Sequence, residues 1–322
     1  MKRWSRAPLP VLLLVAGLVI TACGVGGQSE TATPSEAATA ETGEPPLIPA
    51  SATLERARDL VRDPMRDPLP DNEVLAQQIQ RGYAIFMDTP TNAPSYSGND
   101  LSCTNCHLNG GQKEQALPLV GVAGVFPSYN ARAGRLITLE DRIRGCFVRS
   151  MNADEAPPYD SEELLAVAAY ISWISDGQPT GHSPAWRGQN RIAPENQIPI
   201  DELDVAAGEQ LYNEQCVACH GPDGQGFPLG EVQPGPLWGQ GSWNDGAGAA
   251  RVYTLAGYLR YAMPLSAPGT LTDEQAQLIA AYIDSQARPE YPNKANDYPN
   301  GDVPVDGVYY PQRYPDGNPL RP

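Results

Sequence analysis

The sequence predicts an all-α protein that consists of two tandem helical domains. Three observations carry this prediction. A short cysteine motif occurs twice, and the segments around it recur in the same order in both halves of the chain. The last segment of each repeat has apolar residues at intervals of three and four, the spacing of one helix face. The chain has 322 residues, which is enough for two domains of modest size.

Each copy of the repeat begins with a glycine-containing helix and ends with an amphipathic helix. Ser161 and Thr272 are typical N-caps of the two final helices. We therefore expect the order helix, cysteine motif, long loop, helix and final helix in each domain. The matching segments are Gly82–Phe86 with Gly208–Tyr212, Pro118–Gly121 with Pro236–Gly239, and Ala168–Ile171 with Ala280–Ile283.

The repeated motif is CxxCH, and it predicts one covalently attached haem c in each domain. Two thiols three residues apart on one helical turn can reach both vinyl groups of a haem, and the adjacent imidazole then meets the iron from the same side. Zinc binding or a redox-active dithiol are the alternatives, but two copies in an exported chain favour haem. The six residues are Cys103, Cys106, His107, Cys216, Cys219 and His220.

The N-terminus has the features of an export signal. A basic start precedes an apolar run over 11–20 that is too short to span a bilayer. The run ends in Ile20-Thr21-Ala22-Cys23, which resembles the lipobox of bacterial lipoproteins. We expect an extracytoplasmic protein, periplasmic or on the outer face, that is held at the cell membrane only by a lipid on Cys23. Ordinary cleavage near Ala22 or an uncleaved anchor are the alternatives.

Composition limits the partners and indicates the irregular parts of the chain. The formal net charge is -16, which argues against nucleic acid as a partner. The stretch before the first domain is rich in Ser, Thr, Ala, Glu and Pro, so we expect a flexible tether. The expected division is a signal peptide (1–22), a flexible linker (23–70), domain 1 (71–182), a connector (183–200), domain 2 (201–290) and an irregular C-terminal tail (291–322).

The order of segments resembles class I cytochrome c, in which the first and last helices cross and the haem fills the core. The resemblance covers about 82–175 and 205–287. It implies that the helices touch at the Gly–aromatic segments, since glycine lets two backbones approach closely. It also implies that the carbonyl group of Pro118 or Pro236 orients the iron-binding imidazole.

The two domains differ in the residues that could serve as the second axial ligand of the iron. Histidine is an improbable choice, because the chain has only three and His182 lies in the connector. Met263 precedes Pro264 at the place where class I cytochromes have their methionine ligand, so we expect it to bind the second iron. Met151 is the equivalent residue of domain 1. However, Cys146 lies five residues earlier and has no free partner for a disulfide.

A more specific resemblance lies around Cys146. The segment 139–152 is similar to that of dihaem thiosulfate dehydrogenases in which a cysteine ligates the catalytic haem. Segments 236–239, 242–248, 262–265 and 285–289 also resemble that family. The resemblance implies Cys146 as the ligand of haem 1, with Met151 as the alternative, and Met263 at haem 2. Some members can exchange this methionine for a neighbouring lysine, but Ala262 stands here.

The residues near Cys146 favour an anion site. Five arginines lie between 132 and 149, and a helix over 138–151 would place Arg142, Cys146 and Ser150 on one face. We expect Arg132 and Arg142 to hold a small dianion and Ser150 to donate a hydrogen bond. A solvated charged helix is the alternative. A thiolate lowers the potential of an iron and methionine raises it, so electrons would run from haem 1 to haem 2.

The resemblance implies a thiosulfate dehydrogenase that forms tetrathionate or runs the reverse reaction. It would pass electrons to a redox partner such as another cytochrome or an oxidase. The runner-up is a dihaem electron-transfer cytochrome c without its own substrate, which shuttles electrons between respiratory or photosynthetic complexes. A haem-bearing subunit that needs a partner enzyme is the third possibility.

Overall fold

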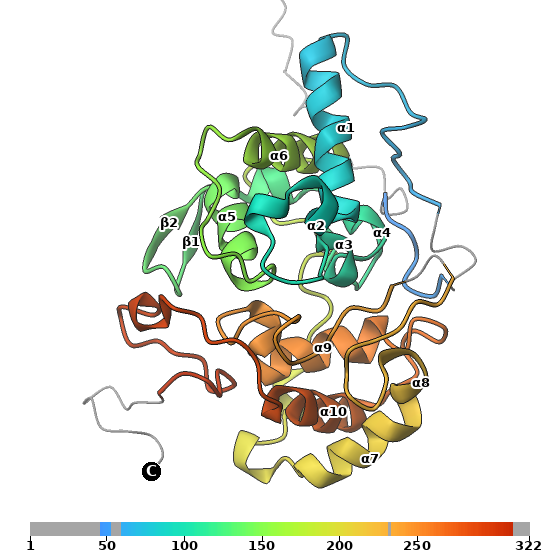
Figure 1. Ribbon diagram of the computed structural model, residues 1–322, viewed down its shortest axis with the longest axis vertical. Coiled ribbons are helices and arrows are strands. Elements are labelled where there is room, and N and C mark those ends of the chain that lie inside the picture. The colour runs from blue at the N-terminus through green and yellow to red at the C-terminus, as the bar shows by residue number, and fades with distance from the viewer. Residues whose placement is uncertain (1–45, 53–58, 231–232, 312–322) are drawn as a thin grey trace, which may run out of the picture. The chain divides into compact units, whose positions relative to one another are not determined.

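The computed structural model describes residues 46–52, 59–230 and 233–311 (Figure 1). The predicted signal peptide, Cys23 and the linker up to residue 45 lie outside these ranges. The structure is mainly helical, as predicted. Its one described sheet is an antiparallel pair, β1 (Ser128–Asn130) and β2 (Arg135–Ile137). Across the described ranges, no helix is long and apolar enough to cross a membrane.

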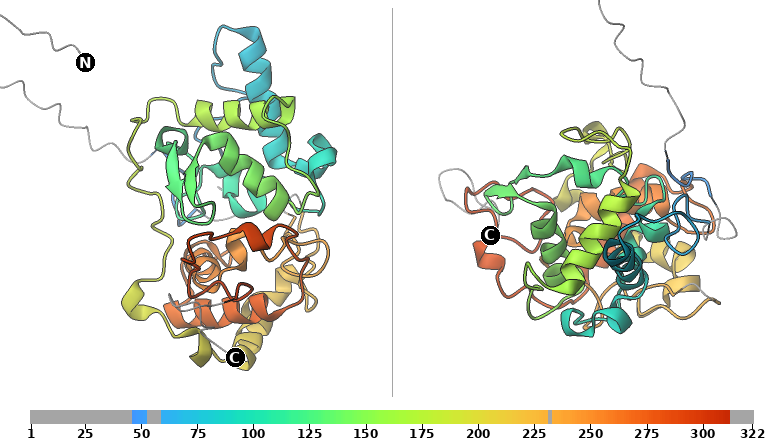
Figure 2. Two further views of the ribbon diagram at one scale, coloured as in Figure 1. Left: turned by 90° about the vertical axis from the view of Figure 1, so that its left-hand side faces the viewer. Right: turned by 90° about the horizontal axis from the view of Figure 1, so that it is seen from above.

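In the first domain, the first and last helices pack against each other, as expected. Gly82 is the point of closest approach, because a Cβ atom there would lie 2.0 Å from the carbonyl oxygen of Ala166. The Ser161 side chain caps the last helix by accepting from the Leu164 N–H. Figure 2 shows the crossing from two further sides. The helices are α1 (Glu73–Met87), α2 (Thr89–Asn92), η1 (Pro94–Tyr96), α3 (Cys103–Cys106), α4 (Leu108–Gly111), η2 (Val122–Val125), α5 (Leu139–Arg149) and α6 (Glu162–Ile174).

The second domain repeats this arrangement. A Cβ atom on Gly208 would lie 2.1 Å from the carbonyl oxygen of Leu278, so this glycine also permits a close helix crossing. Thr272 caps the final helix in a reciprocal box with Gln275. The helices of the connector, the second domain and the tail are η3 (Pro194–Asn196), η4 (Ile200–Glu202), α7 (Val205–Gln215), α8 (Val217–His220), η5 (Gly248–Ala250), α9 (Val252–Ala262), α10 (Asp273–Ser285) and η6 (Lys294–Asn296).

A buried tyrosine fixes the chain just after the CxxCH motif in each domain. The Tyr170 hydroxyl donates to the carbonyl oxygen of Gly110 at 2.7 Å, and the Tyr212 hydroxyl donates to that of Gly221 at 2.7 Å. Both rings lie in the main hydrophobic core. The crossing helices and these two hydrogen bonds therefore hold each CxxCH turn in a defined place.

The described parts of the predicted linker differ from the expectation of a flexible tether. Leu47 and Ile48 are buried, and Ile48 pairs with Lys113 in an isolated β-bridge. The Arg62 guanidinium lies over the Trp173 ring, with its carbon 4.3 Å from the ring centre. A few apolar side chains of these segments are thus buried, although the overall composition predicts disorder.

Candidate functional site

The first CxxCH turn is shaped to present two thiols and one imidazole together. Cys103 and Cys106 lie within the single turn of α3, and His107 follows as its C-cap. Burial raises the pKa of the Cys103 thiol to about 12 and that of Cys106 to about 11. Burial also lowers the pKa of His107, so its imidazole is neutral at pH 7. A neutral imidazole is the form that binds a metal.

A backbone carbonyl fixes the orientation of this imidazole. The Nδ1 atom of His107 lies 2.6 Å from the carbonyl oxygen of Leu117, so Nδ1–H donates there and Nε2 remains an acceptor for iron. The expected partner was the carbonyl of Pro118, so the prediction was wrong by one residue. Leu117 has a φ of 54°, and this left-handed backbone allows its own carbonyl to face the ring.

The second CxxCH turn has the same form. Cys216 is the N-cap of α8, and His220 is its last residue. Burial raises the pKa of the Cys216 thiol to about 12 and lowers that of His220. The backbone carbonyl of Gly235 interacts with this imidazole and opposes part of the fall in its pKa. The expected partner was the carbonyl of Pro236, which is the next residue. Within the described ranges, the Nε1 atom of Trp243 is buried without a hydrogen-bond partner. A thiol pair, a neutral imidazole and an unpartnered indole N–H fit a bound haem with polar substituents.

The zinc alternative has no support from the arrangement of side chains. Among the described residues, no group of three or more His, Cys, Asp or Glu could hold a metal ion. His182 is exposed in the connector, and its Nδ1 atom lies 3.1 Å from the carbonyl oxygen of Thr180. Each CxxCH turn therefore offers one imidazole and two thiols, which is the haem c pattern.

Helix α5 brings Cys146 to the first CxxCH turn. The helix starts at a reciprocal capping box between Thr138 and Asp141. The Cys146 thiol lies close enough to Cys103 and Cys106 to add to the rise in the pKa of both. Cys146 is a free cysteine. The other candidate, Met151, is 4% exposed within the main hydrophobic core.

Met263 lies between the two domains. It is half-buried at the C-cap of α9, beside an apolar cluster formed by Leu108, Ala116 and Ala262. Leu108 directly follows His107, and Ala262 directly precedes Met263. Because Ala262 is only 1% exposed, a lysine at this position would have to lose its hydration inside an apolar cluster. The absence of a lysine here therefore agrees with the packing.

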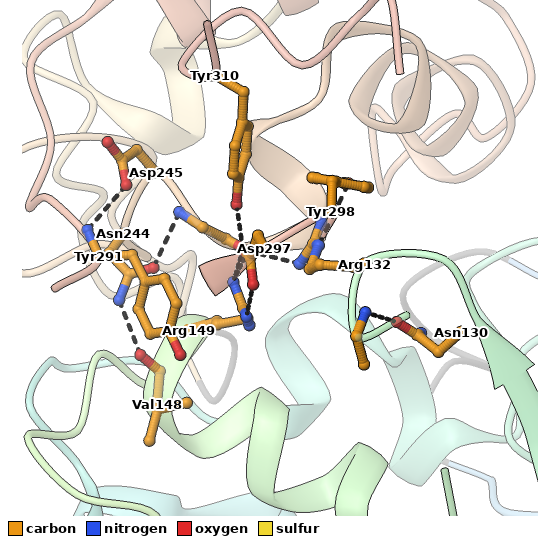
Figure 3. Close-up of polar contacts among 12 residues, drawn as sticks. Asn130, Arg132, Val148, Arg149, Asn244, Asp245, Tyr291, Asp297, Tyr298 and Tyr310 are labelled. Atoms are coloured by element: carbon orange, nitrogen blue, oxygen red, sulfur yellow. Dashed lines mark hydrogen bonds and ion pairs between the residues drawn. The ribbon is translucent and has the colours of Figure 1, made fainter. Parts of the chain in front are cut away.

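The guanidinium of Arg132, a residue expected to hold the dianion, contacts protein groups (Figure 3). Its Nη1 donates to the carbonyl oxygen of Gly246 at 2.6 Å, and its Nε donates to the Tyr298 hydroxyl at 3.3 Å. Tyr298 belongs to the C-terminal tail, far from Arg132 in the sequence. Arg132 thus connects the first domain to the tail.

Three of the other arginines near Cys146 also have partners. Arg135 forms a bidentate pair with Asp141, and the Arg144 guanidinium carbon lies 4.0 Å from the Tyr159 ring centre. Arg149 forms a bidentate pair with Asp297 at 2.7 Å for each hydrogen bond. Arg142 is exposed, and its guanidinium has no hydrogen bond or ion pair to any residue described in the structure. Of the arginines on α5, Arg142 alone has neither a polar nor an aromatic partner among the described residues, which suits it to bind an anion.

Two further arginines, which the sequence reasoning missed, lie near Arg142. Arg187 and Arg191 belong to the connector, where Trp186 anchors the chain by donating from Nε1 to the carbonyl oxygen of Val120 at 3.0 Å. Partial burial and the positive charges of Arg142 and Arg191 lower the pKa of Arg187. Neither connector arginine forms an ion pair with a described residue. In the sequence, the two arginines stand apart from acidic residues, which could have marked them as candidates for anion binding. No regular spacing in the sequence connects them to α5.

Ser150 ends α5, one helical turn after Cys146. Its N–H donates to the carbonyl oxygen of Cys146 at 2.8 Å. The side chain is half-buried, and its hydroxyl has no partner among the residues that the structure describes. The structure thus places Arg142 and Cys146 on α5 with Ser150 as its C-cap, and Arg187 of the connector lies near Arg142.

The comparisons with known proteins match both domains. Residues 94–180 match the family model "SoxA/TsdA, cytochrome c domain", and residues 203–283 match "Cytochrome C oxidase, cbb3-type, subunit III". A thiosulfate dehydrogenase of Stutzerimonas stutzeri is 41% identical over 71% of this chain and 73% of its own length. One from Allochromatium vinosum is 41% identical over 71% of this chain and 84% of its own length.

A solved structure agrees with these relatives. The thiosulfate dehydrogenase (TsdBA) of Marichromatium purpuratum is 36% identical, with a TM-score of 0.65 over 70% of this chain. The chain spans about half the length of that protein, since it covers 49% of it. The prediction of two cytochrome c domains, and hence of two haem c groups, is confirmed. The chain belongs to the thiosulfate dehydrogenase (TsdA) family.

Proposed function

We propose that this protein is a thiosulfate dehydrogenase that joins two thiosulfate ions into tetrathionate, and that the reverse reaction uses the same site. One observation carries the proposal. A free cysteine, Cys146, lies beside the thiols of the first CxxCH turn, on a helix that also bears the unpartnered Arg142. An electron carrier without its own substrate needs no spare thiol at that place.

The haems would be held as the CxxCH motifs imply. Cys103 and Cys106 would attach haem 1, Cys216 and Cys219 would attach haem 2, and His107 and His220 would bind the irons. Cys146, or Met151 in its place, would be the second ligand of the first iron, and Met263 that of the second. When bound, each haem supplies a one-electron acceptor.

The substrate would bind through charge. Thiosulfate is a dianion, and guanidinium groups match its oxygen atoms in a bidentate manner. Arg142 is the primary contact that we propose, with Arg187 and Arg191 adding positive charge from the connector. The Ser150 hydroxyl would donate a hydrogen bond. Arg132 would play a smaller part than expected, since Gly246 and Tyr298 occupy two of its nitrogen atoms.

Cys146 would act as the nucleophile. Its thiolate sulfur forms a sulfur–sulfur bond with the terminal sulfur of the first thiosulfate, and two electrons leave in this step, one for each haem. The second thiosulfate then attacks that terminal sulfur. The bond to Cys146 breaks, the thiolate is restored and tetrathionate departs. In sum, two thiosulfate dianions give one tetrathionate dianion and two electrons.

Contacts between the domains support electron transfer from the first haem to the second. Leu108 and Ala262, the neighbours of two proposed iron ligands, pack in one buried cluster. The Tyr258 hydroxyl of the second domain donates to the carbonyl oxygen of Asn105, inside the first CxxCH turn, at 3.2 Å. These contacts leave no layer of solvent between the two iron-binding segments at this point.

As a c-type cytochrome the protein is extracytoplasmic. We propose that a lipid on Cys23 anchors it to the cell membrane, and that a soluble cytochrome or an oxidase accepts its electrons. The lipobox-like segment supports the anchor. The net negative charge of the chain suits a partner with a basic docking surface.

Steady-state turnover tests this function. Wild-type protein with thiosulfate and an artificial electron acceptor should form one tetrathionate for each two electrons accepted. Cys146→Gly should keep both haems, because attachment depends on the CxxCH cysteines, and should lose turnover. A Cys146→Gly variant with wild-type turnover would contradict the role of Cys146. Wild-type protein with no turnover in either direction would refute the enzyme and favour an electron carrier without its own substrate.

A further inference from the structure

The C-terminal end of α5 requires hydrogen-bond donors from outside the helix. The last four carbonyl groups of an α-helix have no partner within it, and buried ones must find partners elsewhere. In α5 these belong to Cys146, Phe147, Val148 and Arg149. The Cys146 carbonyl accepts from Ser150 and Met151 just beyond the helix, and the Phe147 carbonyl accepts from Ala153. The other two receive no donor from the first domain.

One residue of the second domain satisfies both remaining carbonyls. Asn244 donates from its backbone N–H to the Arg149 oxygen at 3.1 Å, and from its side-chain Nδ2 to the Val148 oxygen at 2.8 Å (Figure 3). Its Nδ2 also donates to the side-chain oxygen of Asn152 at 3.0 Å. Asn244 is 1% exposed, so water cannot replace these bonds at little cost.

The C-terminal tail holds the same end of α5 by a second route. Asp297 binds the Arg149 guanidinium with two hydrogen bonds of 2.7 Å, and the Tyr310 hydroxyl donates to Asp297 at 2.6 Å. The Arg149 guanidinium carbon also lies 4.0 Å from the centre of the Tyr291 ring. The side chains of the pair are 15% and 6% exposed, which shields it from solvent screening.

These contacts place Cys146 one helical turn from an anchor that belongs to the other domain. We propose that Asn244 is a positioning residue for Cys146, and that Asp297 assists it through Arg149. The second domain and the tail thereby set where the Cys146 sulfur stands relative to the first iron. The inference rests on the proposed function, because it takes Cys146 as the iron ligand and nucleophile. It also gives the C-terminal tail a role.

The test uses the full-length dihaem protein and measures Cys146 itself. In Asn244→Ala, electron paramagnetic resonance of the oxidised protein should show a loss of thiolate-ligated haem. Iodoacetamide, followed by peptide mass spectrometry, should alkylate Cys146 at least about fivefold faster, the factor for one buried hydrogen bond. Asp297→Asn, which keeps the size of the side chain, should shift both measurements in the same direction by less.

Asn92 provides a matched control. Its Nδ2 donates to the carbonyl oxygens of Ala84 and Asp88 at the end of α1, far from Cys146 in the sequence. Asn92→Ala should leave both measurements unchanged. If Asn244→Ala and Asp297→Asn unfold at a lower temperature yet keep the wild-type spectrum and alkylation rate, the contacts are merely structural and the inference is overturned. A wild type without a thiolate signal would instead assign Met151 to the first iron and overturn the inference, whereas the proposed function is tested separately by turnover with thiosulfate.

Discussion

Arg142→Gln should weaken the binding of tetrathionate by about tenfold. The change removes the positive charge and retains a side chain of similar length. Arg142 has no carboxylate partner in the described part of the chain, so no described protein group neutralises its charge. A hydrogen bond to a charged group contributes about 1.5–3 kcal/mol, or roughly ten- to a hundredfold. Arg142 is exposed, and solvent screening places its effect at the lower end of that range.

Isothermal titration calorimetry of the fully oxidised protein isolates this binding step. Reduction of tetrathionate needs two electrons, and a fully oxidised protein has none to give, so the heat reports binding alone. Arg187→Gln should weaken binding in the same direction. Raising the salt concentration should weaken wild-type binding more than that of Arg142→Gln, since part of the attraction is screened.

Arg135 supplies the control for this prediction. It lies close to the start of α5, but both of its Nη atoms donate to Asp141 at 3.0 Å. Its charge is thus neutralised locally, and Arg135→Gln should leave tetrathionate affinity within about twofold of wild type. Equal losses in Arg135→Gln and Arg142→Gln would show that general charge attracts the anion. An unchanged affinity in Arg142→Gln would refute the proposed site.

Three further predictions concern the helix crossings, haem 2 and the anchor. Gly82→Ala and Gly208→Ala should each destabilise the protein by at least about 1–3 kcal/mol in thermal unfolding, because the new methyl group overlaps a backbone carbonyl. A Cβ atom on Gly145 would meet no atom within 4 Å, so Gly145→Ala should stabilise the protein by about 1 kcal/mol. If Gly145→Ala lowered the unfolding temperature more than the other two variants, the proposed helix crossings would be contradicted. Met263→Gly should abolish the near-infrared sulfur-to-iron band and lower one of two midpoint potentials, whereas a surviving band would assign it to Met151. Cys23→Ser should release the protein from the membrane fraction, and mass spectrometry should find an acylated Cys23 in wild type; a soluble wild type would exclude the anchor.

The local features of the fold could be predicted from the sequence. The CxxCH turns, the caps at Ser161 and Thr272, and the glycines at the helix crossings all depend on residues a few positions apart. The resemblance to class I cytochrome c implied the pairing of first and last helices and the glycines at their crossing. The CxxCH motifs and the caps are short-range signals, so one sequence is enough to read them.

The partners of the arginines could not be predicted from the sequence. Arg132 and Arg149 look like Arg142 in the sequence, yet their partners Gly246, Tyr298 and Asp297 lie in another domain or in the tail. Only the three-dimensional structure tells which guanidinium is left for a substrate. Similarly, composition predicted a flexible tether over residues that include the buried Leu47 and Ile48, and a composition average does not detect single anchors.

Single-turnover mixing tests the central claim most directly. Oxidised wild-type protein is mixed with thiosulfate in a stopped-flow spectrometer, without any other acceptor, while haem absorbance is followed. The account predicts that thiosulfate reduces the haems of the wild type, that tetrathionate reoxidises the reduced protein, and that Cys146→Gly does neither while retaining both haems. A wild type that stays oxidised with thiosulfate and stays reduced with tetrathionate would contradict it.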